Sequence, residues 1–505
     1  FENDYDGTIG SASTTLSAGN GSLVSSCTRS SRVLEGSQIL HATELGDRDV
    51  TSTTKDELNA TNHSRRDGLY FLIVGAVIYL LGGLVFIQKL PFAMTDFKVV
   101  YFSARCLTRH CDPYSVDNMR QLFHDNAQFN VAGHPGVQVV IERFFYPPTI
   151  FPITAPLALL PFLFAKLVWI IIGTTSYLAA AYLMWRAGAP RSPLLAGILS
   201  GFLVANSIWL FMIGNSAMLS IGLCIVAVYT FVEQRLEWAG VLLLAASLLI
   251  KPHNAGPVWL YFLLAGPIYR KRAMQTLAAV VVLSIPAILI INNVSPHWVN
   301  ELRDNASFFA RHGSYTDPSP RSGIGHDIDA VVELQSVVSV LWEEPSVYNS
   351  VSYAICGVLL LIWMGATVRL KPGTENAWLG LAAIAALAML PVYHRQHDAR
   401  LIILCIPACL ALLSEGRQLG KWALGITAAS IILLGDLASA LRITLFEPWL
   451  KLQAGASGKV LTVILGRPAQ FSLFCLAVFY VSVYARRAWV SGKTSLTSAS
   501  DSQPV

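Results

Sequence analysis

The sequence predicts an all-α polytopic membrane protein of about twelve transmembrane helices with large extracytoplasmic loops. Of the 505 residues, 54% are hydrophobic and only 13% are charged, and the mean hydropathy is +0.52. The charge lies in short stretches between apolar runs of roughly 15 to 22 residues, about the length that a helix needs to cross a ~30 Å hydrocarbon core. A transmembrane β-barrel would alternate apolar and polar residues in segments of ~10 residues instead.

The apolar runs give the expected order of the spans. They fall near 70–89, 163–185, 192–207, 213–233, 239–251, 256–269, 274–292, 347–368, 377–392, 400–414, 421–440 and 467–485. Lys and Arg in the short loops favour a topology with both termini in the cytoplasm, because basic loops are retained on that side. Spans 239–251 and 400–414 are short and lie beside polar breaks, which is typical of helices that line a cavity.

This topology divides the chain into four regions. We expect a disordered cytoplasmic tail at 1–67, a transmembrane core at 68–415 with outer loops 90–162 and 293–346, further transmembrane helices at 416–487 with outer loop 441–466, and a second disordered cytoplasmic tail at 488–505. The tails are polar and lack periodicity. The net charge of +5 reflects mostly loop Lys and Arg, so it indicates no nucleic-acid partner.

Polar residues gather at the predicted outer face. They are Asp96, the region of Asn215, Lys251–His253 and His394–Arg400. Cys106 and Cys111 lie in the same outer region, where a disulfide can persist, although the sequence leaves open whether they are bridged. Asp436 lies within a late span, where an intramembrane acid marks either a functional site or a pair within the helix bundle.

Four sequence islands carry a resemblance. They are "TDFKVVYFSAR...CDPYS" (Thr95 to Ser115), "FFYPP" (Phe144 to Pro148), "IGNSAML" (Ile213 to Leu219) and "AGVLLLAASLLIKP" (Ala239 to Pro252). In this order and spacing the chain resembles the polyprenol-phosphate-dependent glycosyltransferases of family 87, of the integral-membrane GT-C class, over roughly 70–415. The third island departs from the family pattern, because Gly214-Asn215-Ser216 stands where Gly-Gln followed by Asn is usual.

The resemblance implies a GT-C-like bundle in which 68–415 is the catalytic core. It implies an inverting enzyme of the plasma (inner) membrane with its active site on the extracytoplasmic side. Such an enzyme moves a hexose, typically mannose, from a polyprenyl-phosphate sugar to a glycolipid, glycan or protein acceptor. The expected partners are therefore the lipid-linked donor, the acceptor and membrane lipids, and neither a cofactor nor a metal is expected.

Asp96 matches the acidic position of the family and is the expected general base. The acceptor hydroxyl must lose a proton as it attacks the anomeric carbon, and one carboxylate usable near neutral pH can accept it. A phosphate leaving group needs no second carboxylate to protonate it, unlike the leaving group in glycoside hydrolysis. The alternative is that Asp96 or Thr95 caps the helix that follows.

Cations far away in sequence are expected to bind the donor. Lys251 ends a short apolar helix and is predicted to contact the carrier phosphate, the alternative being an ammonium that snorkels to the interface. In "YHRQHDAR", His394, His397 and Asp398 would share one face if the segment is helical; the alternative is a solvated, self-paired helix end. The predicted donor-binding set is Lys251, His253, His394, Arg395, His397, Arg400, Tyr101 and Asn215.

Two other classes of protein remain as alternatives. A lipid-linked sugar flippase or secondary transporter also has many spans and broken helices, but it predicts two similar halves and polar residues near the bilayer midplane. A polysaccharide polymerase or ligase would rely on arginines of the second outer loop, here Arg303, Arg311 and Arg321. In the same loop His326, Asp327 and Asp329 are interpreted as a polar loop motif rather than as metal ligands.

Overall fold

The structure, a computed structural model, describes residues 47–90, 92–125, 140–311, 314, 316–319, 331–371, 373–445 and 456–500. The chain divides into two units, Phe1–Leu58 and Asn59–Val505, and the fold below is that of the second unit. Every element described is helical, apart from an isolated antiparallel bridge between Val331 and Arg395. The predicted all-α class is therefore confirmed for the described residues.

The elements follow in this order. The first half holds α1 (Asp47–Lys89), α2 (Thr95–Thr108), α3 (Val116–His124), η2 (Pro148–Ile150), α5 (Phe151–Ala158), α6 (Phe162–Gly188), α7 (Pro193–Ala205), α8 (Ile208–Met212), α9 (Ser216–Val232) and α10 (Glu237–Ile250). Then come α11 (Pro252–Leu264), α12 (Pro267–Val294), α13 (Trp298–Ala310), α14 (Gln335–Leu341), α15 (Pro345–Arg369) and α16 (Thr374–Leu387). The chain continues with η4 (Asp398–Leu404), α17 (Cys405–Ser414), α18 (Gln418–Leu433), α19 (Asp436–Leu445), α21 (Ala456–Leu461), η5 (Thr462–Gly466) and α22 (Pro468–Ser500).

Helix is found inside both predicted tails. α1 begins at Asp47, so residues 47–67 are helical, and residues 1–46 lie outside the described residues. At the other end α22 continues to Ser500, and residues 501–505 lie outside the described residues. Hydropathy predicts that these two helices begin and end with their apolar residues, but both helices continue into polar sequence.

Among the residues that the structure describes, five helices are long and apolar enough to cross a membrane. They are Asn62–Lys89 within α1, α6, α12, α15 and Pro468–Val490 within α22. The pair α18 and α19, bent by 65° at its break, adds a sixth if it is counted as one span. Helices α7, α9 and α10 are apolar but shorter. The part of the chain that the structure describes thus supports a membrane protein of five or six such helices, and the expected twelve crossings stay a prediction.

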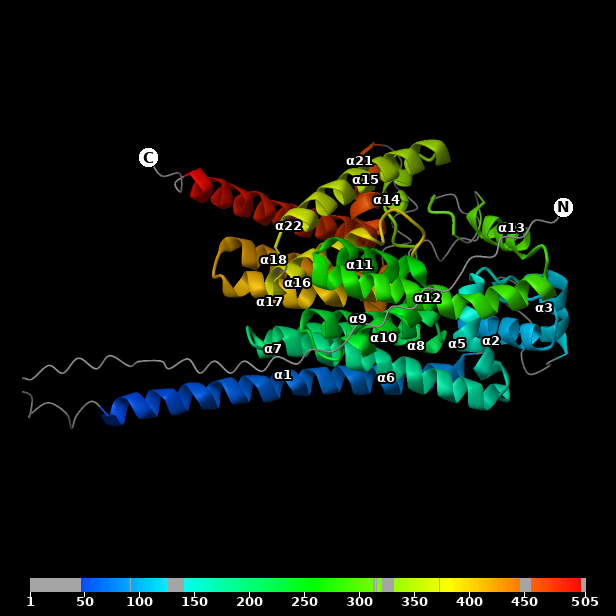
Figure 1. Ribbon diagram of the computed structural model, residues 1–505, viewed down its shortest axis with the longest axis horizontal. Helices are drawn as coiled ribbons and strands as arrows, with labels where there is room; N and C mark the ends of the chain where they lie inside the picture. The colour runs from blue at the N-terminus through cyan, green and yellow to red at the C-terminus, as the bar shows by residue number, and fades with distance from the viewer. Residues whose placement is uncertain are drawn as a thin grey trace, which may run out of the picture. The chain divides into compact units, whose positions relative to one another are not determined.

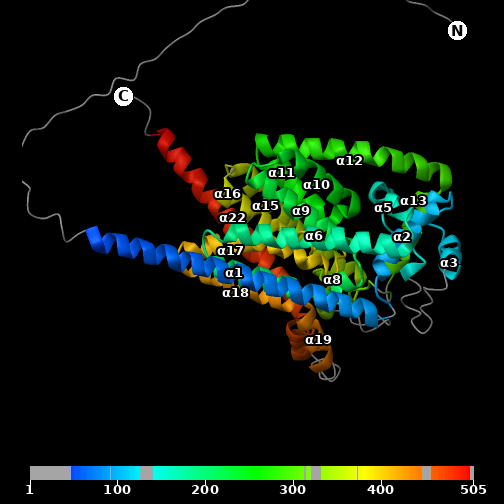
Figure 2. The same ribbon diagram turned by 90° about the horizontal axis from the view of Figure 1, so that it is seen from below.

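The helices of Asn59–Val505 form an elongated bundle with a cap of short helices at one end. Figures 1 and 2 show α6 and α12 running along the bundle, with α2, α3, α5 and α13 gathered at one end of it. α6 starts at this end, next to α5 in the chain, and packs against α9 along its length. The described residues of the predicted first outer loop are therefore largely in short helices.

Glycines let α1 pack closely against α7. A Cβ on Gly75 would lie 2.1 Å from the carbonyl oxygen of Gly201, and one on Gly197 would lie 1.9 Å from that of Gly68. Gly197 and Gly201 form a G-x-x-x-G pair, the pattern that allows two membrane helices to bring their backbones together. This contact fixes the membrane helix that leads into α2.

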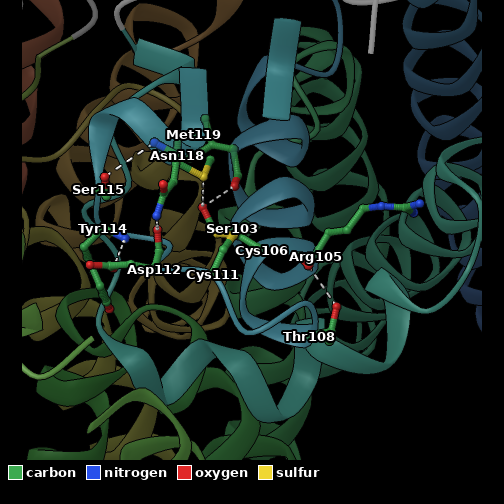
Figure 3. The surroundings of a disulfide bond; sticks show 11 residues. Ser103, Arg105, Cys106, Thr108, Cys111, Asp112, Tyr114, Ser115, Asn118 and Met119 are labelled. Carbon is green, nitrogen blue, oxygen red and sulfur yellow. Dashed lines mark hydrogen bonds between the residues drawn. A yellow bond between two sulfur atoms is a disulfide. The ribbon is translucent and has the colours of Figure 1, made fainter. Parts of the chain in front are cut away.

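A disulfide closes the turn that follows α2. Cys106 and Cys111 are bonded to each other (Figure 3), which settles the question that the sequence left open. In the next turn the backbone N–H of Tyr114 donates to Oδ1 of Asp112 at 2.9 Å, and the Tyr114 hydroxyl donates to the carbonyl of Tyr146 at 2.9 Å. The bridged turn therefore supports the backbone just before η2 and α5.

Candidate active site

Asp96 lies in the first turn of α2, and its carboxylate does not cap that helix. The cap position is Met94, which has a left-handed φ of 59° and no capping side chain, and the Thr95 hydroxyl donates to the carbonyl of Phe92. The backbone N–H groups of Met94 and Asp96 donate instead to the carbonyls of Met212 at 2.8 Å and Ile213 at 3.0 Å. Because the backbone satisfies this helix end, the capping alternative is wrong and the carboxylate is available for other bonds.

The turn that receives Asp96 ends in Asn215, the N-cap of α9. Gly214 has a φ of 64°, a conformation that glycine adopts without steric cost, and a Cβ there would press on Met94 and Phe97. Oδ1 of Asn215 accepts from the backbone N–H of Ala217 at 2.7 Å, a typical cap bond. Its Nδ2 donates to Oδ2 of Asp96.

Lys251 sits at the break between α10 and α11. Pro252 is the first residue of α11, and proline has no N–H for continuing a helix but suits a first position. The Lys251 ammonium is buried and donates to Oδ1 of Asn215 at 2.9 Å and to Oδ1 of Asp398 at 2.9 Å. It therefore does not snorkel; it joins α9 to η4.

The segment 394–397 is not helical, so the condition under which His394, His397 and Asp398 would share a helical face is not met. His394 and Arg395 lie beside Val331 and Val332, and the Val332 N–H donates to the carbonyl of His394 at 2.9 Å. Residues 396–397 form a turn that leads into η4. Asp398 and His397 still come together, with Nε2 of His397 at 3.8 Å from Oδ2 of Asp398. Pairing with a segment that is distant in the sequence therefore replaces helical periodicity here.

These elements enclose a pocket of about 480 Å³ at the end of the bundle where α2 and α13 lie. Its polar and aromatic lining is Asp96, Phe145, Tyr146, Asn215, Lys251, His253, Phe309, Thr316, Tyr393, Arg395, His397 and Asp398. Five predicted donor-binding residues, from three separate parts of the sequence, thus lie around one cavity with the proposed base. A cavity of this size is in the range of small-molecule sites.

Burial shapes the charge state of the pocket. It raises the pKa of Asp96 above the ordinary range, although the hydrogen bond from Asn215 opposes the shift. Burial also lowers the pKa of His253 to about 3, helped by the neighbouring His394 ring. Burial would raise the pKa of Asp398, but the Lys251 ammonium bonded to it holds that pKa well below the usual value. At neutral pH the pocket therefore combines an ion pair with an uncharged His253.

Three predicted donor-binding residues do not line this pocket. The Tyr101 hydroxyl donates to the carbonyl of Leu160 at 2.7 Å and accepts from Arg105 at 2.6 Å. Nδ1 of His394 is 2.9 Å from the carbonyl oxygen of Val392, and its ring packs on that of His253 behind the pocket wall. These side chains are committed to internal contacts.

Arg400 is the third, and its role is internal pairing. Its guanidinium donates to Oδ1 of Asp436 at 2.6 Å and to the carbonyl of Asn206 at 2.9 Å. This pair also accounts for the acid within the late span, because an intramembrane carboxylate is expected to have a partner. Both residues lie outside the pocket that holds Asp96.

Sequence reasoning missed Asp398 as a pocket residue and overlooked Asn254 and α13. Nδ2 of Asn254 donates to Oδ1 of Asp398 at 2.9 Å, and Phe309 of α13 contributes to the pocket wall. One signal for Asp398 was present, since a buried lysine needs a counter-charge and Asp398 is the acid of its cluster. Phe309 carries no such signal, because an amphipathic helix with a buried aromatic is common.

Among the described residues, no group of three or more His, Cys, Asp or Glu is arranged to hold a metal ion. His326, Asp327, Asp329 and Arg321 lie outside the described residues. Of the arginines named for a polymerase or ligase, Arg303 is exposed on α13 and Arg311 lies over the Phe308 ring at 5.8 Å. Neither lines the pocket.

The fold and the pocket define a class of protein. This is a helical membrane protein with a polar pocket that brings a carboxylate and an ammonium together. The family model of glycosyltransferase family 87 matches residues 144–391, and this match supports a membrane glycosyltransferase. The match includes Asn215 and Lys251, while Asp96 and Asp398 flank it. No curated protein and no solved structure matches the chain.

Proposed function

We propose that this glycosyltransferase is an inverting enzyme that moves a hexose, with mannose the first candidate, from a polyprenyl-phosphate sugar to an extracytoplasmic lipid, glycan or protein acceptor. The observation that carries the proposal is the linkage within the pocket. The Asp96 carboxylate and the Lys251 ammonium bond to opposite ends of the same Asn215 amide. A proton acceptor and a cation are the two groups that this reaction needs on either side of an anomeric carbon.

The chemistry assigned to the pocket uses one base. The acceptor hydroxyl attacks the anomeric carbon from the side of Asp96 and gives its proton to that carboxylate. The bond from the anomeric carbon to the phosphate oxygen breaks, and its electron pair leaves with the polyprenyl phosphate toward Lys251 and Arg395. A single displacement inverts the anomeric centre, and the phosphate leaves without being protonated.

The lining of the pocket supports a sugar ligand. Tyr146 is buried beside the polar groups, and Phe145 has 37% of its surface exposed in the wall. Aromatic rings present flat apolar faces, which suit the C–H faces of a hexose, while carboxylates and amides bond its hydroxyls. We assign the lipid tail of the donor to the bilayer outside this wall.

The disulfide supports an extracytoplasmic pocket. Cys106 and Cys111 are bridged in the element that begins with Asp96, and disulfides persist in oxidising compartments rather than in the cytosol. We therefore place the pocket on the outer side of the plasma membrane and both termini in the cytoplasm, as the basic loops favour. A periplasmic cysteine-labelling assay before and after reduction tests this orientation.

The reaction is tested with the purified full chain in lipid nanodiscs. Radiolabelled mannose on a polyprenyl phosphate is supplied with a membrane lipid extract as acceptor, and the product anomer is determined. We expect transfer without any nucleotide sugar and with an inverted anomeric configuration. Transfer from a nucleotide sugar alone would refute the donor assignment. In sealed vesicles, movement of the lipid-linked sugar without any transfer would favour the transporter alternative.

A further inference from the structure

The Lys251 ammonium is oriented by two acceptors on different elements. Its Nζ donates to Oδ1 of Asp398 on η4 at 2.9 Å and to Oδ1 of Asn215 before α9 at 2.9 Å. An ammonium carries three N–H donors, so two fixed acceptors determine the direction of the third. These are its hydrogen-bond partners among the described residues, and Lys251 lines the pocket. The third N–H is thus left for a ligand.

Asp398 is held from other directions. Its Oδ1 also accepts from Asn254 at 2.9 Å, and its Oδ2 accepts from the backbone N–H of Arg395 at 3.2 Å. His397 lies 3.8 Å from the same Oδ2. Because several other bonds fix this carboxylate, its position does not depend on Lys251, and it orients the Lys251 ammonium.

The orientation of the Asn215 amide is determined by its neighbours. Oδ1 accepts from Ala217 at 2.7 Å and from Lys251 at 2.9 Å, so the opposite orientation would set an NH₂ group against two donors. Nδ2 is therefore turned toward Asp96 and donates to its Oδ2. Within the described part of the chain this leaves the other carboxylate oxygen of Asp96 for the acceptor hydroxyl.

We propose that Asp398 and Asn215 are positioning residues of the transfer reaction, with Asp398 fixing the Lys251 ammonium and Asn215 fixing the separation between that ammonium and the Asp96 carboxylate. The inference rests on the proposed function. It replaces the expectation that Asn215 binds the donor directly, and it gives Asp398 a role. A fixed separation matters because a displacement of about 1 Å between reacting groups can cost roughly 10²-fold in rate.

The role of Asp398 is tested by a double-mutant cycle in the full chain. The variants are Asp398→Asn, Lys251→Met and the combination. We expect Asp398→Asn to lower kcat/KM for the donor by about 10- to 100-fold, because the Lys251 ammonium loses one of the two acceptors that fix its direction. In the Lys251→Met background the same change should add less than about threefold. An equal effect in both backgrounds would overturn the proposal.

The role of Asn215 is tested by Asn215→Asp, which keeps the acceptor oxygen and replaces the donor with a second carboxylate oxygen. We expect the acidic limb of the pH–rate profile to move to higher pH, because a neighbouring negative charge disfavours ionised Asp96. An unmoved acidic limb would show that Asn215 does not act on Asp96. The conservative Asn215→Gln variant separates a loss of folding from a loss of position.

Asp436→Asn is the matched control. Asp436 also forms an ion pair, with the buried Arg400 at 2.6 Å, but outside this pocket. Asp436→Asn should lower the unfolding temperature without moving the acidic limb of the pH–rate profile. A moved acidic limb would overturn the proposal, because it would show that the profile responds to any loss of stability.

The unfolding temperatures of the three variants in the double-mutant cycle provide a test that needs no substrate. The Asp398→Asn/Lys251→Met double variant should be more stable than the Lys251→Met single variant, which leaves a buried charge unpaired. If unaltered enzyme transfers no sugar, the proposed function fails; if transfer is intact but this coupling is absent, the positioning proposal alone fails.

Discussion

Replacing Asp96 with Asn separates the chemistry of the pocket from its architecture. The substitution removes one charge and one proton acceptor while it keeps the size of the side chain. An Asn amide oxygen at position 96 can still accept from Nδ2 of Asn215, and the bonds to Met212 and Ile213 that hold this turn are made by the backbone. The pocket should therefore keep its shape.

The expected loss is that of a general base. Such groups contribute about 10²- to 10⁴-fold in rate, which corresponds to about 3–5 kcal/mol of transition-state stabilisation. The loss should fall on kcat, while KM for the donor stays within about threefold, because the cation that faces the phosphate, Lys251, is bonded to Asn215 and Asp398 rather than to Asp96.

The same variant should not lose stability. Burial raises the pKa of Asp96, so the folded state binds the proton more tightly than the unfolded state. The stability that this group contributes is fully present below the unfolded pKa of about 4 and is lost as the pH rises through the higher folded pKa. At pH 7 the ionised side chain is therefore a net cost, and Asp96→Asn should unfold at an equal or higher temperature. Its advantage should shrink as the pH falls toward about 4.

The assay is single-turnover transfer from radiolabelled polyprenyl-phosphate mannose, paired with thermal unfolding at pH 4 and pH 7. Asp117→Asn is the control, because Asp117 is an exposed acid paired with Arg120 on α3 and should change neither readout. Retention of more than about a tenth of the rate by Asp96→Asn would refute the assignment of the base. A marked fall in unfolding temperature at pH 7 would refute the argument from burial.

Three further changes test other parts of the structure. Cys106→Ser should lower the free energy of unfolding by about 2 kcal/mol, since the disulfide closes a short loop, and a reductant should reproduce that loss in the unaltered chain, as measured by thermal unfolding. Gly201→Val places a side chain against the backbone of α1 at Phe71 and should destabilise by about 1–3 kcal/mol. The measurement is the fraction of folded monomer that remains in detergent on heating, and an unchanged fraction would contradict the close contact. Arg400→Met should destabilise by less than the about 3–5 kcal/mol of a fully buried pair, because the half-buried Asp436 loses its cation but keeps the bond from the Trp209 N–H. KM for the donor should stay unchanged in the folded fraction, and a raised KM would show that Arg400 binds the donor.

The positions of the apolar helices were predictable because burial in lipid leaves a strong and local signal. Each expected span overlaps an observed helix, including the short ones at 239–251 and 400–414. The ends were less predictable, because α1 and α22 continue into polar sequence where hydropathy carries no information. The local structure of 394–397 was missed because its pairing with Val331 and Val332 comes from a distant segment. A three-residue spacing cannot reveal such pairing.

The charged residues of the pocket could be predicted from the sequence, but the hydrogen-bond partners of these residues could be predicted less well. Topology placed Asp96, Lys251 and the 394–400 cluster on one side of the membrane, and the structure brings Asp96, Lys251 and Arg395 around one cavity. Which arginine faces that cavity depends on side-chain direction, which sequence does not give. Arg395 lines it, while Arg400, only five residues on, turns to Asp436.

The charge balance of the pocket explains how a lone base suffices. Asp96 and Asp398 carry two negative charges against the positive charges of Lys251 and Arg395, and burial keeps His253 neutral. A phosphodiester donor adds one negative charge. On transfer, Asp96 takes up a proton and becomes neutral while the phosphate gains the second charge, so the total does not change. The reaction that we propose therefore moves one negative charge from the Asp96 side of the sugar to the Lys251 side. Because Asn215 bonds both groups, a single amide spans the path along which that charge is displaced.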